Sequence, residues 1–128
     1  MIEKLYSEET LKRHGIAVKL MKQGKLDEAK AIYKRLLYID KSFVKTYNNL
    51  GIIYKLQGRL RDAEKSFKKA LKLDPKLVPV ISNLANIYRI KGEIIKAEKF
   101  CRKAIKLDHD FADAYNILGA IMQIQGNP

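Results

Sequence analysis

The chain has 128 residues, of which 47% are hydrophobic and 31% are charged, and it contains a single cysteine. No apolar run approaches the roughly 20 residues of a membrane-spanning helix, and one cysteine cannot form an internal disulfide. This composition excludes an integral membrane protein and a disulfide scaffold, whereas the net charge of +12 keeps nucleic acid and acidic polypeptides as partners to be considered.

The first segment, residues 1–9, is expected to lead into the folded domain. It carries Glu3, Glu8 and Glu9 and lacks the basic and then apolar layout of a secretory signal. We therefore expect a soluble, cytoplasmic protein that does not bind a membrane.

Residues 10–128 repeat with a period of 34 residues, which is marked by four glycines: Gly24, Gly58, Gly92 and Gly126. Each glycine follows a segment in which apolar residues have helical spacing, and similar segments follow the first three at 25–38, 59–73 and 93–107. A glycine directly after a helix can adopt the left-handed conformation that closes a tight turn. We therefore predict an all-α fold in which each repeat has a first helix, a tight turn and a second helix.

Positions 34 residues apart, here called a column, carry similar side chains. One column of the first helices holds only small residues, as expected where two helix backbones approach closely: Ala17, Gly51, Ala85 and Gly119. The columns define three full repeats, 10–43, 44–77 and 78–111, and a half repeat, 112–128, whose helix at 112–125 has no partner. The prediction is seven helices in a solenoid, the last of them unpaired.

This pattern resembles the tetratricopeptide repeat (TPR). The motif of that family is met most fully by Leu50, Gly51, Tyr54, Gly58, Ala63, Phe67, Ala70 and Pro75. The resemblance implies a right-handed superhelix whose concave groove is lined by the first helices, and repeat proteins use such surfaces for binding. It also implies a scaffold for protein–protein interaction rather than an enzyme.

Side chains of the first helices are the candidate binding residues of this groove. They are Lys22, Lys45, Asn48, Asn49, Ile52, Lys55, Ser82, Asn83, Asn86, Arg89, Asn116 and Gln123, beside His14, Val18, Pro79, Asp113, Ile117 and Ala120. Because an amide both donates and accepts hydrogen bonds, a ladder of asparagines can bind a peptide backbone, and such a ladder is similar to those with which members of this family grip extended polypeptide. The alternative for each asparagine is a solvated position on the helix surface.

The charge of the groove residues favours an acidic partner. Lys22, Lys45, Lys55 and Arg89 are basic, and Asp113 is the one acid of the set. The family's two-carboxylate clamp for chaperone tails needs lysine, asparagine and arginine at set columns, and the residues found there include isoleucine and aspartate. We therefore expect an extended acidic or carboxylate-ended peptide, but not the tail of a heat-shock chaperone.

No set of residues predicts catalysis, a metal site or a cofactor. His14 and His109 lie nearly three repeats apart, and the glycines form no phosphate-binding cluster. Cys101 shares a column with Tyr33 and Phe67, which predicts a buried core thiol rather than a nucleophile.

Positive charge is spread over the helices and not gathered in one run. On the second helices it falls at positions typical of a solvated outer face. No aromatic ladder accompanies the lysines, because the repeat core takes Tyr47, Tyr54, Phe67 and Tyr88. Binding of nucleic acid is therefore the least favoured hypothesis.

The last predicted helix, 112–125, is apolar around most of its circumference. Tyr115, Leu118 and Met122 form a strip that a further second helix would normally cover. Either the chain is a piece of a longer array, or another molecule covers the strip. The second hypothesis for function is accordingly self-association, as a homodimer, through Tyr115, Leu118 and Met122.

Overall fold

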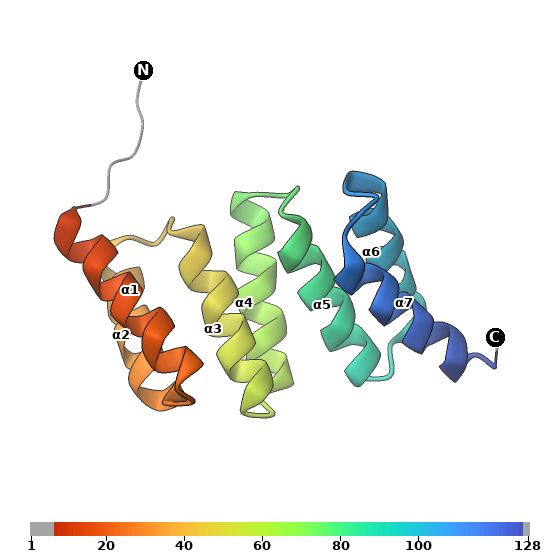
Figure 1. Cartoon of the computed structure of the whole chain (residues 1–128), viewed down its shortest axis with the longest axis horizontal. Helices are drawn as coiled ribbons and strands as arrows, with labels where there is room; N and C mark the ends of the chain where they lie inside the picture. Colours follow the sequence, from red (N-terminus) through yellow and green to blue (C-terminus); the bar gives the residue numbers. More distant parts are fainter. Residues whose placement is uncertain (1–6, 127–128) are drawn as a thin grey trace, which may run out of the picture.

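The structure, a computed structural model, describes residues 7–126, and within this range it contains seven α-helices and no strand. The helices are α1 (Glu8–Lys22), α2 (Leu26–Ile39), α3 (Val44–Leu56), α4 (Leu60–Leu73), α5 (Val78–Ile90), α6 (Ile94–Leu107) and α7 (Ala112–Ile124). Figure 1 shows them side by side along the long axis of the molecule, with α1 and α2 at one end and α7 at the other. The predicted all-α solenoid of seven helices is confirmed.

Helix α1 begins at Glu8, inside the segment expected to lead into the domain. The side-chain oxygen of Ser7 accepts a hydrogen bond from the backbone N–H of Thr10 (3.1 Å), which satisfies one of the free donors at the helix start. Residues 1–6 and 127–128, to which parts of the predicted lead-in and half repeat belong, lie outside the described range.

The turn inside each repeat depends on its glycine, as predicted. Gly24 has φ +79° and Gly58 has φ +77°, in the left-handed region. After Gly24 the N–H of Lys25 donates to the carbonyl of Leu20 (2.9 Å), and the same bond recurs in the next two turns at 2.8 Å. This pattern satisfies carbonyl groups left free at the helix end and reverses the chain.

An aspartate follows the last residue of each second helix, at Asp40, Asp74 and Asp108. Each carboxylate accepts the backbone N–H two residues further on, at 2.9, 3.3 and 3.0 Å. Such a turn does not depend on proline. Lys41 and His109 can therefore replace the proline found at Pro75 without loss of the turn.

The core continues from repeat to repeat. The columns of small residues lie at helix contacts: Gly51 is buried beneath the ring of Phe67, and Ala63 and Ala70 are fully buried. Cys101 is also fully buried, as predicted, and burial raises the pKa of its thiol to about 11. The thiol is therefore protonated at neutral pH and occupies a place in the core.

One carboxylate connects two successive repeats. Glu64 on α4 forms ion pairs with Lys68 of the same helix (2.8 Å) and with Lys91 at the end of α5 (2.7 Å), and it accepts a hydrogen bond from the hydroxyl of Tyr88 (3.3 Å). Burial by itself would raise the pKa of Glu64, but the hydrogen bonds from the two lysines outweigh it and lower the pKa to about 2.

Within residues 7–126, no helix combines the length and the apolar character that crossing a bilayer requires.

Candidate peptide-binding groove and C-terminal face

The predicted groove residues all belong to the first helices, α1, α3, α5 and α7. Helix α5 contacts α3 on one side and α7 on the other, so these three first helices form a continuous surface. With one exception, the candidate residues are at least partly exposed on their helices.

The exception is Ser82, whose prediction as a groove residue is wrong. Its side chain is 1% exposed, and its hydroxyl has no hydrogen-bond partner among the described residues. Helix α5 is packed against α3, α4, α6 and α7. A side chain in the middle of the array, such as Ser82, is therefore buried where the equivalent position at an end of the array is open.

An asparagine pair joins α3 to α5 on this surface. The amide nitrogen of Asn83 donates to the side-chain oxygen of Asn48 (3.1 Å), and both residues remain partly exposed. No other described side chain or backbone group pairs with the amide nitrogen of Asn48 or the amide oxygen of Asn83. The pair thus presents an unpaired NH2 group on Asn48 and an unpaired amide oxygen on Asn83.

Asn49 differs from Asn83, although the two residues share a column. The amide of Asn49 donates to the hydroxyl of Tyr33 (3.0 Å), a fully buried residue of α2. The residue that takes the place of Tyr33 one repeat later is Phe67, which has no hydroxyl, so Asn83 pairs with Asn48 instead. The expected ladder of equivalent asparagines is replaced by two different hydrogen bonds. The sequence indicates this difference, because the column of Tyr33 holds phenylalanine one repeat later.

Basic side chains also lie on the first helices. The guanidinium of Arg89 donates twice to the amide oxygen of Asn86, at 3.1 and 2.8 Å, which holds it on the surface of α5. Lys55 is partly exposed at the end of α3, and Lys22 and Lys45 are exposed. These cations can attract a carboxylate to the first helices.

His14 lies at the α1 end of this surface, between two aromatic rings. Its ring centroid is 5.5 Å from that of Tyr33 and 4.9 Å from that of Phe43. Burial and the nearby charge of Lys45 lower the pKa of His14, so the imidazole is neutral at pH 7. The described residues contain no cluster of His, Cys, Asp or Glu that could hold a metal ion.

At the other end of the described residues, α7 is the last helix. Tyr115 is 47% exposed and donates its hydroxyl to the carbonyl of His109 (3.0 Å). Met122 is half-buried, and Leu118 is half-buried against the main core. A Cβ atom on Gly119 would have no heavy atom within 4 Å. Open space therefore adjoins the predicted apolar strip, although Leu118 is partly committed to the core.

Models of known repeats match most of this region. A model described as tetratricopeptide repeat matches residues 44–77 and 79–111, and a second, described as TPR repeat, matches residues 19–58. The chain belongs to the tetratricopeptide repeat family. No curated protein matches the sequence.

Solved TPR structures share this fold over nearly the whole chain. The type III secretion chaperone SycD of Yersinia enterocolitica, in complex with a peptide of the translocator YopD, has a TM-score of 0.85 at 19% identity over 96% of this chain and 99% of its own. The first TPR of Spaghetti (RPAP3), bound to the HSP90 peptide SRMEEVD, has a TM-score of 0.88 at 22% identity over 96% and 98%. MamA has a TM-score of 0.78 at 30% identity over 95% of this chain and 67% of its own.

Proposed function

We propose that this TPR protein is a non-enzymatic scaffold that binds an extended, acidic polypeptide segment on the groove surface of its first helices. The observation that carries the proposal is the Asn48–Asn83 pair. Its unpaired NH2 group belongs to Asn48 on α3 and its unpaired oxygen to Asn83 on α5, and these groups complement the C=O and N–H groups of an extended peptide backbone.

The acidic preference rests on the cations carried by the same two helices, α3 and α5. Arg89 is held in place by Asn86, and Lys55 lies at the end of the neighbouring helix. Two TPR proteins of the same fold, SycD and RPAP3, have been solved with bound peptides, and the HSP90 peptide in the latter contains glutamate and aspartate. A peptide with spaced carboxylates is the ligand that this surface fits best.

The test is a measurement of peptide affinity in the protein and in an Asn48→Ala, Asn83→Ala double variant. Ligands are first selected from a displayed library of unstructured acidic peptides. Loss of both amides should weaken binding by roughly 1–3 kcal/mol, because backbone groups of the peptide lose their partners on desolvation. The control variant, Gln23→Ala with Gln125→Ala, removes two exposed amides outside the candidate groove. Full affinity in the Asn48, Asn83 variant with unchanged circular dichroism would refute the proposal.

A second candidate function is self-assembly through α7, and the open space at Gly119 favours it. SycD has also been solved as an alternative dimer. A second copy of the chain would cover Tyr115 and Met122 by pairing the two helices around a twofold axis. Because Leu118 is already half-buried, the apolar area gained is small, and we expect weak to moderate dimerisation, with no more than about 5 kcal/mol before association costs.

A further inference from the structure

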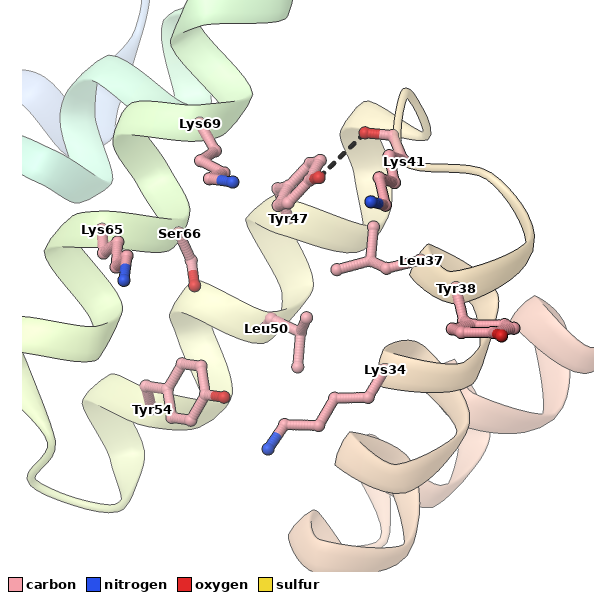
Figure 2. Close-up of a pocket in the computed structure, with 10 residues that line it drawn as sticks. All are labelled: Lys34, Leu37, Tyr38, Lys41, Tyr47, Leu50, Tyr54, Lys65, Ser66 and Lys69. Carbon is pink, nitrogen blue, oxygen red and sulfur yellow. Dashed lines mark hydrogen bonds between the residues drawn. The ribbon is translucent and has the colours of Figure 1, made fainter.

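A hollow of about 430 Å³ lies between α2 and α4, on the side of the second helices. Figure 2 shows Lys34 extending from α2 and Lys69 extending from α4 toward the space between the two helices, and Lys65 lies on α4 beyond Ser66. Lys41, in the turn before α3, completes a set of four lysines at this hollow. The lysines of the second helices were interpreted from the sequence as a solvated outer face. The packing of α2 against the next repeat brings three of them together with Lys41.

The positive charge of the hollow is not neutralised locally. None of its lining residues is acidic. The two acids of α4 are directed elsewhere, because Asp62 pairs with Arg59 (2.8 Å) and Glu64 pairs with Lys68 and Lys91. A concave surface with charge of one sign concentrates ligands of the opposite sign.

The hollow also has an apolar component. Leu37 and Leu50 line it between the helices, and the ring of Tyr47 is held there by a hydrogen bond from its hydroxyl to the carbonyl of Lys41 (2.8 Å). At the rim, Tyr38 is 89% exposed, an unusual position for a large aromatic side chain. Exposed aromatic residues beside an apolar depression are typical anchors of protein interfaces.

The shape of the surface favours a polypeptide. A second depression of about 260 Å³ shares Lys41, Tyr47 and Lys69 with the hollow and continues to Lys72 and Leu73. The surface is thus elongated, with lysines along it and an apolar centre.

Nucleic acid fits this surface less well. Lys69 lies 6.0 Å over the ring of Tyr47, and Lys30 and Arg59 lie 5.6 and 5.5 Å over the ring of Tyr54. Only Tyr38, among the tyrosines of the hollow, is almost fully exposed for stacking on a base. Single-stranded nucleic acid is usually held by several such rings in succession.

We propose that the lysine hollow is a second protein-binding site, separate from the asparagine pair, for an acidic peptide segment that places a bulky apolar side chain between α2 and α4. The carboxylates of the segment contact Lys34, Lys41, Lys65 and Lys69, and the apolar side chain lies against Leu37 and Leu50. Tyr38 covers the peptide from the rim.

The test uses a fluorescent peptide in which glutamates surround a Leu-Phe pair, and its binding is measured by anisotropy. A Lys65→Glu, Lys69→Glu variant should bind this peptide at least roughly tenfold more weakly, because attraction becomes repulsion at the hollow. The matched control is Lys99→Glu with Lys103→Glu, which makes the same charge change in the same columns one repeat later, on exposed positions of α6. The control variant should keep most of the affinity.

Four further measurements complete the test, the last of them with an oligonucleotide. A peptide with serine in place of Leu-Phe should bind the wild type at least roughly tenfold more weakly, because the apolar anchor of the peptide is lost. The original peptide should bind the Tyr38→Ala variant at least roughly tenfold more weakly, because the aromatic side chain at the rim is lost. In the Asn48→Ala, Asn83→Ala background, the Lys65→Glu, Lys69→Glu change should still weaken binding of the Leu-Phe peptide at least roughly tenfold, which separates this site from the proposed groove. The proposal is overturned if the wild type does not bind, if both lysine variants lose affinity equally, or if an oligonucleotide of equal charge binds better with the same dependence on Lys65 and Lys69.

Discussion

The ring of Phe67 on α4 covers the backbone of Gly51 on α3, so that a Cβ atom at residue 51 would lie 2.6 Å from Cδ1 of Phe67. Phe67 is fully buried and cannot move aside without disturbing the core. The equivalent residue of α7, Gly119, has open space in the same direction. The two glycines occupy one column, but a Cβ atom would meet the ring of Phe67 at Gly51 and no described heavy atom within 4 Å at Gly119.

Alanine at these two glycines should change stability in opposite directions. Gly51→Ala should destabilise the protein by roughly 1–3 kcal/mol, because overpacking against Phe67 exceeds the gain in helix propensity. Gly119→Ala should stabilise it by about 0.5–1 kcal/mol through helix propensity alone. Urea unfolding of both variants at low protein concentration measures the difference. Equal effects of the two substitutions would contradict the contact at Gly51.

The hydrogen bond from Asn49 to Tyr33 should contribute to folding. Asn49→Ala leaves a buried hydroxyl without its partner and should cost roughly 1–3 kcal/mol, whereas Asn83→Ala should cost clearly less because its partner Asn48 remains partly exposed. Adding Tyr33→Phe to Asn49→Ala removes the hydroxyl and reproduces the situation at Phe67, so much of the lost stability should return. Denaturant midpoints of the single and double variants check this; if Tyr33→Phe gives no recovery, the bond does not explain the loss.

The ion pairs of Glu64 should make stability depend on pH in the acidic range. Because the folded protein lowers the pKa of this carboxyl from 4.5 to about 2, the unfolded state binds more protons between these values. The stabilisation is therefore fully present above about pH 4.5 and is lost as the pH falls toward 2.

At neutral pH, Glu64→Gln should cost roughly 1–2 kcal/mol, and the difference from the wild type should shrink as the pH is lowered through that range. Thermal unfolding at a series of pH values measures it. Glu98→Gln, the equivalent change one repeat later, removes a carboxylate paired with Arg102 of its own helix and is the control. A difference between wild type and Glu64→Gln that is constant with pH would be incompatible with the assignment.

Dimerisation through α7 should be sensitive to a charge at Gly119. Gly119→Lys places a long cation in open space beside Tyr115 and Met122 and should prevent a second α7 from approaching, without damage to the fold. Gly15→Lys makes the same change on the exposed surface of α1, where a Cβ atom also meets nothing within 4 Å, and should leave association unchanged. Analytical ultracentrifugation over a range of concentrations distinguishes the two, and a wild type that stays monomeric at high concentration would rule out this function.

The 34-residue period of the sequence was sufficient to predict which segments of this protein form helices and where the tight turns lie. Gly24 and Gly58 predicted the left-handed turns, and the column of Gly51 predicted a close helix contact, because turn geometry and backbone approach depend on one position and its immediate neighbours. Only the tertiary structure decided which groups are contacted by residues at equivalent positions of different repeats. Asn49 meets a tyrosine hydroxyl and Asn83 does not. Ser82 is buried on a helix that packs against four others, and lysines of α2 and α4 line one hollow. Each of these outcomes depends on side chains of the neighbouring repeat. Those side chains differ from repeat to repeat, so the 34-residue period does not predict them.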